Sequence, residues 1–181
     1  MAKRPRNRTL DNYLPIIQDM ESADDRTAAI VGASLVENNL VMVIMNRLRD
    51  SLDDTEIKRL FDDRGAVLGT FANRVDIGFG LNLYDKPVRD DLDRIREIRN
   101  RFAHHLEVRT FDHPDVAGKC DALNASKYFG IHVVRRPAPP TRKHIYIDTA
   151  AFLAINFDIE ATKARRPLKP MFLQYVWSMD L

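Results

Sequence analysis

Apolar residues recur at helical spacing along most of the chain. The spacing predicts a short helix over 9–21. The longest periodic run follows it, begins at a cap formed by Ser22, Asp24 or Asp25, and continues to about Asp50. Residues 55–61 predict a third, short helix that ends at a polar turn. The N-terminal third of the chain is therefore expected to be entirely helical.

Two more amphipathic helices are predicted in the middle of the chain. Residues 68–84 repeat apolar side chains every three or four positions despite three glycines. Each glycine costs about 1 kcal/mol against alanine inside a helix, so Gly78 and Gly80 indicate close approach by a neighbouring segment. Pro87 suits the first turn of the next helix, which should continue to about Glu107. Its expected buried stripe is Val88, Leu92, Ile95, Ile98, Phe102 and Leu106.

The pattern is weaker after residue 107. A short helix is expected from the HPD sequence at 113–115 through Leu123. Residues 128–136 and 144–148 alternate as strands do, with a proline-rich connector between them. We expect these two runs to pair as a small β-hairpin near residues 130–148.

The C-terminal part of the chain predicts one last helix and an apolar tail. Asp148 or Thr149 can cap a helix that runs to about Ala164. Residues 165–181 include Phe172, Tyr175 and Trp177, too many large apolar side chains for a tail that stays in water. This tail is expected to dock, either on its own chain or on a partner subunit.

Length and composition fit one all-α domain over residues 1–181. The chain has few glycines for its length and 30% charged residues, as antiparallel helical bundles do. A net charge of +2 is too small to indicate a nucleic-acid-binding protein by itself. Residues 1–8 carry four basic side chains and should form a basic flexible arm, either solvated or in contact with RNA or DNA.

Cysteine usage and hydropathy indicate a soluble cytoplasmic protein. The single cysteine, Cys120, excludes an internal disulfide framework and a cysteine zinc site, and a packing role is expected for it. The first thirty residues lack the apolar run of an export signal. The most apolar segment, 28–45, has Glu37, Asn38 and Asn39 at its middle, which a membrane-spanning helix would have to bury. We expect no membrane association, no metal and no cofactor.

The sequence IREIRNRFAHHLE at 95–107 raises the question of a functional site. On a helix Arg96, Asn100 and His104 form one ridge, with Arg99 on the neighbouring row. Arg99 and His104 lie roughly 140° apart on one helix, so they meet on one ligand only if the helix loosens or a second chain contributes. A homodimer with two such helices crossing at its two-fold axis would bring the groups together.

These side chains suit phosphodiester chemistry without a metal. Guanidinium groups bind phosphate through two hydrogen bonds, and an imidazole moves protons near neutral pH. RNA carries its own nucleophile, the 2′-hydroxyl, so a base and a charge clamp could leave a cyclic phosphate. A purely structural interpretation is also open, because His104 and His105 near a helix C-terminus complement its dipole by about 0.3–1 kcal/mol.

Longer segments resemble a known family. RGAVLGTFANRVDIGFGLNLY, DDLDRIREIRNRFAH and TFDHPDV, in this order, resemble the mannitol operon repressor (MtlR) family, and DDRTAAIVGASLVENNL resembles its preceding helix. The likeness covers roughly residues 24–116. It implies a bacterial regulator of repressor type that lacks a dedicated DNA-reading element. This agrees with the sequence, in which we find no helix-turn-helix pair.

RNRFAH also resembles the R-x4-6-H motif of the HEPN superfamily, helical bundles that include metal-independent endoribonucleases. This resemblance implies that Arg99 clamps phosphate, that Asn100 is the polar residue after it, and that His104 is catalytic. Glu37 resembles an accompanying acid, although a buried acid paired with an arginine is an equal interpretation. Arg96, Arg101 and His105 are expected to contact nucleic acid or a partner.

Three functions therefore remain open. The first is an MtlR-like regulator acting through protein or nucleic-acid contacts. The second is a HEPN-type endoribonuclease, and the third is a HEPN-like scaffold or antitoxin partner whose motif is only structural.

Overall fold

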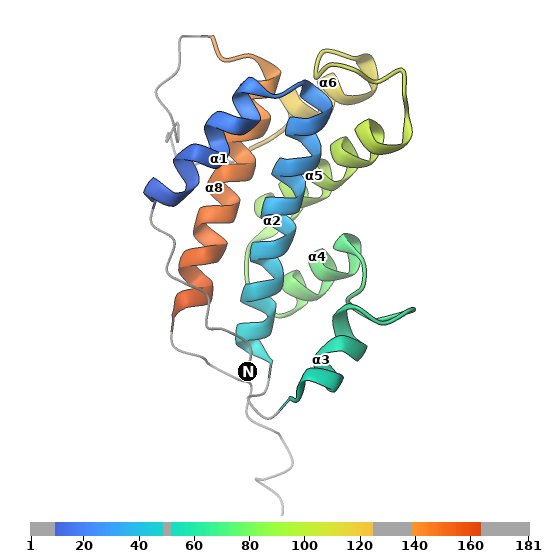
Figure 1. Ribbon diagram of the computed structural model, residues 1–181, viewed down its shortest axis with the longest axis vertical. Helices are drawn as coiled ribbons and strands as arrows, with labels where there is room; N and C mark the ends of the chain where they lie inside the picture. Colours follow the sequence, from blue (N-terminus) through green and yellow to red (C-terminus); the bar gives the residue numbers. More distant parts are fainter. Residues whose placement is uncertain (1–9, 49–51, 125–138, 164–181) are drawn as a thin grey trace, which may run out of the picture.

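The computed structural model describes residues 10–48, 52–124 and 139–163 of the chain. The described residues are all-helical and form a bundle, which confirms the predicted fold class (Figure 1). The basic arm at 1–8 and the tail at 165–181 lie outside them. The helices are α1 (Leu10–Ser22), α2 (Asp25–Arg47), α3 (Asp54–Phe61), α4 (Phe71–Gly80), α5 (Lys86–His104), α6 (Pro114–Asp121) and α8 (Arg142–Thr162).

The bundle is built around α2 and α8, which form its most extensive helix pair. The pair runs parallel, because the Tyr146 hydroxyl donates to the Ala29 carbonyl (2.6 Å) near both N-termini and Arg47 pairs with Glu160 (3.0 Å) near both C-termini. Midway, the buried Asn39 amide donates to the Ala154 carbonyl (2.9 Å). Figure 1 shows both helices running the length of the molecule.

The other long helices run against this pair. α1 is antiparallel to α2, because Tyr13 near its start accepts a hydrogen bond from Asn39 (2.9 Å) while Met20 near its end lies by Gly32. α5 is antiparallel to α2 as well, since its last turn contacts Arg26 in the first turn of α2. The predicted antiparallel arrangement therefore holds for α1 and α5, and α8 is the exception.

Most helix boundaries agree with the spacing of apolar residues. α4 begins at Phe71, later than the expected residue 68, because the Thr70 hydroxyl accepts from the Asn73 amide (3.2 Å) and caps it there. α5 ends at His104, and Leu106 is 79% exposed, so its predicted place in the buried stripe is wrong. Gly78 does meet a close neighbour, the Tyr84 ring, whereas Gly80 faces open space, so that part of the prediction is wrong.

The expected strand at 144–148 is wrong. These residues lie in the first two turns of α8, which begins at a Thr141 cap whose hydroxyl accepts from the His144 amide (3.3 Å). The predicted caps Asp148 and Thr149 are consequently inside the helix. The alternation of apolar and polar residues at 144–148 wrongly indicated a strand. Because α8 is buried on most of its surface, the spacing of its apolar residues does not distinguish a strand from a helix well. Residues 128–136, the other half of the expected hairpin, lie outside the described residues.

Among the described helices, α2 is long and apolar enough to cross a membrane by length and composition. Half of that window is buried inside the bundle, as in the core helix of a folded domain. Glu37 is ion-paired with Arg74 on α4 and Asn39 is hydrogen-bonded to α8, so two of its polar groups have protein partners.

We predict opposite effects for two glycine substitutions. In Gly32→Ala the new Cβ would lie 2.9 Å from Tyr146 Cε1 and 3.4 Å from Ala150 Cβ. Overpacking this contact between α2 and α8 should cost about 1–3 kcal/mol. In Gly80→Ala no atom lies within 4 Å, so stability should rise by up to about 1 kcal/mol. Urea denaturation measures both; equal effects would contradict this packing.

Candidate phosphate-binding surface at the end of α5

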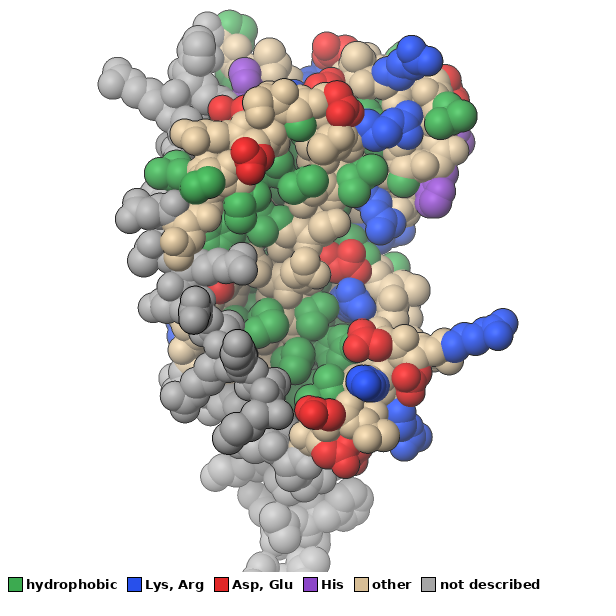
Figure 2. Space-filling view, viewed as in Figure 1, with side chains coloured by type: hydrophobic (Ala, Val, Ile, Leu, Met, Phe, Trp, Pro, Cys, Tyr) green, Lys and Arg blue, Asp and Glu red, His purple; other side chains and the backbone are tan. Residues whose placement is uncertain are grey.

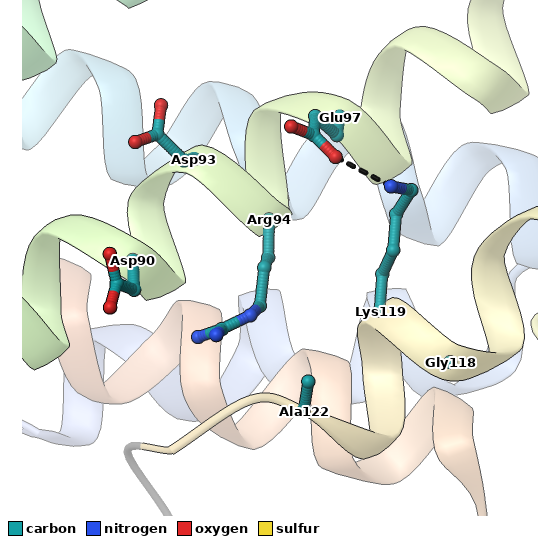
Figure 3. A pocket seen from close by; sticks show the side chains of 7 residues that line it. All are labelled: Asp90, Asp93, Arg94, Glu97, Gly118, Lys119 and Ala122. Atoms are coloured by element: carbon teal, nitrogen blue, oxygen red, sulfur yellow. Dashed lines mark hydrogen bonds and ion pairs between the residues drawn. The ribbon is translucent and has the colours of Figure 1, made fainter.

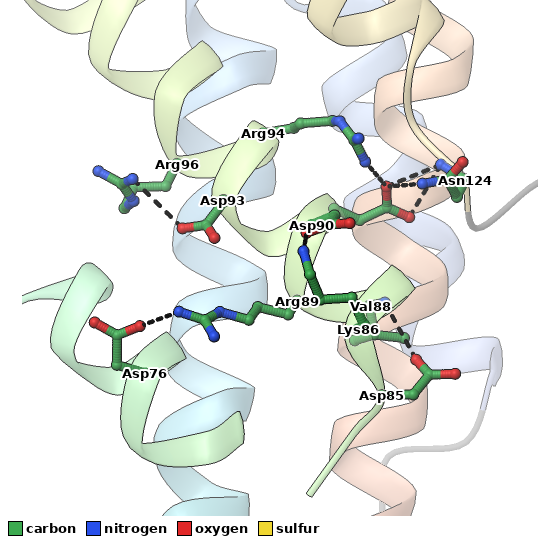
Figure 4. Close-up of polar contacts among 11 residues, drawn as sticks. Asp76, Asp85, Lys86, Val88, Arg89, Asp90, Asp93, Arg94, Arg96 and Asn124 are labelled. Carbon is green, nitrogen blue, oxygen red and sulfur yellow. Dashed lines mark hydrogen bonds and ion pairs between the residues drawn. The ribbon is translucent and has the colours of Figure 1, made fainter. Parts of the chain in front are cut away.

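The helix α5 is oriented by a buried stripe and by ion pairs on its flanks. Its buried residues are Asp91, Leu92, Ile95, Ile98 and Phe102. On one flank Arg89 pairs with Asp76 of α4 (2.7 Å), as Figure 4 shows. On the other side, buried Asp91 accepts from the Asn124 backbone amide (2.9 Å) and pairs with Arg94 (3.0 Å), which joins α5 to the segment after α6. The face that carries the predicted site is thereby fixed relative to the bundle.

Arg26 of α2 holds the C-terminal end of α5. Its guanidinium donates to the carbonyls of Phe102, His105 (3.1 Å) and Val108 (3.0 Å). A helix C-terminus leaves carbonyls without intrahelical partners and carries a partial negative charge, and Arg26 satisfies both. The segment from Phe102 to Val108 is thus attached to α2 by one cation.

Arg99 and Asn100, two of the predicted site residues, contact each other. Both side chains are half-buried, and Arg99 Nη1 donates to Asn100 Oδ1 (3.0 Å). The carboxamide oxygen orients the guanidinium without neutralising it. No described carboxylate pairs with Arg99.

The two neighbouring histidines differ in their surroundings. His105 caps α5 and lies 3.1 Å from Glu107 and 3.3 Å from Arg101, so its imidazole belongs to a local network. His104 is exposed, and within the described part of the chain its imidazole has no hydrogen-bonding partner. His105 is the C-cap residue of α5, and the guanidinium of Arg26 also donates hydrogen bonds to carbonyls at this helix end.

The other predicted site residues have partners of their own. Arg96 contacts Asp93 (3.4 Å; Figure 4), and its buried Nε has no hydrogen-bond partner among the described residues. Arg101 is exposed and lies 3.9 Å from Asp115. Glu37 pairs with Arg74 at 2.6 Å, so the arginine partner that it finds comes from α4. Glu37 is therefore a half-buried structural acid in this fold, and its carboxylate is engaged away from Arg99.

Three acidic side chains near the end of α5 are each paired with a basic side chain. Lys119 donates to Glu97 (2.6 Å) and lowers the pKa of that carboxyl. Arg142 bonds both Asp112 and Asp121 (each 2.8 Å), and these carboxylates raise its pKa.

Several basic side chains near the end of α5, in contrast, have no carboxylate partner among the described residues. They are Arg99, exposed Arg109 and His104. Figure 2 shows blue and purple side chains gathered at the edge of the molecule that α6 and the end of α5 form. The local field should therefore favour an anion.

A shallow groove of about 420 Å³ lies on the α6 side of α5 (Figure 3). Its lining carries three acids and two basic residues, and the Glu97–Lys119 ion pair spans it. Mixed charge and openness make it a poor ligand site. The described residues include no cluster of acids, histidines or cysteines able to hold a metal ion.

Cys120 is no candidate nucleophile. Its side chain is fully buried, and this burial raises the pKa of the thiol to about 12. The thiolate is the reactive form, so a thiol in this environment is inert at neutral pH. The packing role expected from the sequence agrees with this position.

Sequence reasoning missed Arg26, Arg74 and Arg109. Arg26 lies between the cap of α2 and its apolar run, and only the fold reveals that the end of α5 passes there. Arg109 follows α5 in a loop with no helical pattern. Comparisons with protein-family models, curated proteins and solved structures find no match to this chain.

We predict that Arg26→Met destabilises the protein by about 2–3 kcal/mol, because charge-assisted hydrogen bonds to several carbonyls are lost together. Arg26→Lys should recover only part of this, since an ammonium lacks the planar fork. Urea denaturation gives the free energies of unfolding. Arg109→Met, which removes an exposed arginine nearby, should change stability by less than about 0.5 kcal/mol. Equal costs for the two methionine variants would refute the capping role.

Proposed function

We propose that the chain is a cytoplasmic regulatory protein of MtlR type that acts through contact with a nucleic-acid phosphate backbone. The contact surface consists of Arg96, Arg99, Asn100, Arg101, His104, His105 and Arg109. The protein acts as a homodimer and needs neither metal nor cofactor. A regulatory protein partner can join the same assembly.

One observation carries this proposal. At the end of α5 Arg99, Arg109 and His104 lack carboxylate partners within the described residues, whereas Glu97, Asp112 and Asp121 nearby are each bound by a cation. Solvent-accessible cations that are not neutralised release counterions when they bind phosphate, which favours association with RNA or DNA. Arg99 is also pre-oriented by Asn100, which reduces the entropy cost of binding.

The proposed contact is to the backbone and not to base edges. Arginine and histidine side chains at a helix end position a duplex or a single strand without reading sequence. This suits a regulator without a helix-turn-helix pair. Sequence choice would then come from the partner protein or from nucleic-acid shape.

We predict that Arg99→Gln and Arg109→Gln each weaken binding to a fluorescent RNA oligonucleotide and to a DNA duplex. Each change should also lower the log–log slope of affinity against salt by about 1, as loss of one phosphate contact does. Fluorescence anisotropy at several salt concentrations measures both quantities. Arg64→Gln, an exposed arginine in the turn after α3, is the matched control and should bind as the wild type does. Equal losses in all three variants would argue against a localised surface.

RNA cleavage is a second candidate, favoured by an exposed His104 imidazole and by an Arg99 side chain, elsewhere on the same helix, that is hydrogen-bonded to Asn100. In this reaction the 2′-oxygen bonds to phosphorus while the bond from phosphorus to the 5′-oxygen breaks. One imidazole accepts the 2′-hydroxyl proton, and a second protonates the leaving 5′-oxygen. Arg99 stabilises the phosphorane charge. Because Arg99 and His104 diverge by roughly 140° on one helix, two copies of α5 must form the site.

For this second function we predict cleavage of single-stranded RNA in the presence of EDTA, with 2′,3′-cyclic phosphate ends. His104→Ala should abolish cleavage while circular dichroism and urea stability stay unchanged, because the side chain is exposed. His113→Asn is the control, since asparagine can replace the α6 cap formed by the His113 ring. If varied RNAs bind but stay intact, cleavage is excluded and the binding function stands.

A further inference from the structure

The side of α2 that faces away from the bundle core is apolar toward its C-terminal end. α2 buries Val36, Leu40, Val43 and Ile44 in the core. At 100° per residue, Val41, Met42 and Met45 lie on the opposite side. These three are only partly buried. We call them the outer α2 patch, and Figure 2 shows apolar side chains at the surface over this half of the helix.

A helix that is apolar on all sides is normally covered on all sides. In α2 the core side is covered by α1, α4, α5 and α8. Farther along the outer side, Ser34 and Asn38 separate the outer α2 patch from Ile30 and Val31. The outer α2 patch is thus a bounded surface a little over one turn long, which suits a short apolar segment.

The described chain leaves α8 next to this surface. α8 runs parallel to α2 and ends beside the last turn of α2, where the Asn46 amide donates to the Lys163 carbonyl (3.3 Å) and Arg47 pairs with Glu160 (3.0 Å). Because Lys163 contacts Asn46 of α2, the segment that follows Lys163 begins close to the turn of α2 that carries Met42 and Met45. Eighteen residues, 164–181, remain beyond that point.

The composition of this segment divides into a linker and an apolar part. Residues 163–170 contain four basic side chains and two prolines, whereas eight of the eleven residues from 171 to 181 are apolar. Seven linker residues can span roughly 20 Å, more than the distance covered by two helical turns. The apolar part can therefore reach the outer α2 patch without strain.

We propose that residues 171–181 pack on the outer α2 patch of their own chain and complete the covering of α2. Attachment a few residues away gives this segment an effective concentration that a free partner does not reach. A second copy of the chain would have to displace it. The inference is independent of the nucleic-acid surface, which lies at the opposite end of α2, beside Arg26.

The chain has a built-in reporter for this contact, because Trp177 is its only tryptophan. In the full-length protein we expect Trp177 emission to be blue-shifted relative to the urea-denatured chain, with little quenching by acrylamide. Met42→Lys and Val41→Lys should each shift the emission to the red and raise the quenching constant severalfold. Lysine favours helix, and its stem covers apolar surface, so far-UV circular dichroism should be unchanged.

Two further variants decide between surfaces. Ile159→Lys alters an apolar residue on α8 that is 49% exposed and close to the exit of the segment, and Leu106→Lys alters one that is 79% exposed beyond the end of α5. Both should leave Trp177 emission as in the wild type. A red shift with Ile159→Lys alone would place the segment on α8 and overturn the proposal. A wild-type Trp177 that is solvent-exposed would overturn it as well.

Protein concentration separates this contact from an exchange between copies. If emission and quenching stay constant on dilution while light scattering follows the oligomeric state, the contact is within one chain. If the blue shift disappears as the protein dissociates to monomer, the segment packs on a second copy and the proposal is wrong. These readouts need no RNA, so their failure leaves the proposed nucleic-acid function untouched.

Discussion

The candidate surface depends on the hydrogen bonds that the guanidinium of Arg26 donates to the end of α5. From the first turn of α2 it binds carbonyls at the end of α5 and in the loop beyond, as far as Val108. The neighbouring Asp25 carboxylate accepts from the Phe111 amide (3.0 Å), so two consecutive side chains fix the whole turn. The Phe111 ring then packs against Phe102 and Tyr146 at centroid distances of 5.0 and 5.1 Å. A polar cap and an aromatic cluster thus stabilise the same corner of the bundle.

This arrangement explains how cationic groups can remain uncompensated at a helix end. An isolated helix C-terminus attracts its own lysine, arginine or histidine side chains. Here the attraction is met by Arg26 from another helix, and the local acids are met by Lys119 and Arg142. Arg99, Arg109 and His104 can therefore face an anion in solvent. None of these three groups pairs with a described carboxylate, which is the physical basis for proposing a phosphate ligand.

The sequence predicted the helices where one face is apolar and the other polar. α1, α3, α5 and α6 were expected close to their observed bounds, whereas the Arg99–Asn100 hydrogen bond was not predicted from the sequence. The first turns of α8 were mistaken for a strand, because burial on most sides removes the periodicity that identifies a helix. Close approach was expected at Gly78, where it occurs, and at Gly80, where it does not. It also occurs at Gly32, where the Tyr146 ring comes from a helix more than a hundred residues away.

Contacts between distant segments could not be predicted from the sequence. Glu37 was expected near the site or paired with an arginine, and the choice of Arg74 depends on how α4 crosses α2. The role of Arg26 depends on α5 running antiparallel to α2, which spacing alone does not determine. Both are consequences of packing in three dimensions. The spacing of residues in the sequence identified the candidate residues. Only the three-dimensional structure shows which of their charged groups are paired with a group of opposite charge.

The central claim is that the end of α5 presents cations to a phosphate backbone, and NMR titration tests it most directly. A short single-stranded RNA should be added to isotopically labelled protein while imidazole and backbone amide resonances are followed. The account predicts that the largest shifts fall on the His104 imidazole and on amides from Arg99 to Arg109, with His144 and α3 unaffected. Shifts concentrated in α3 or along the α5–α6 groove, or no shifts at an RNA concentration that saturates comparable binders, would contradict it.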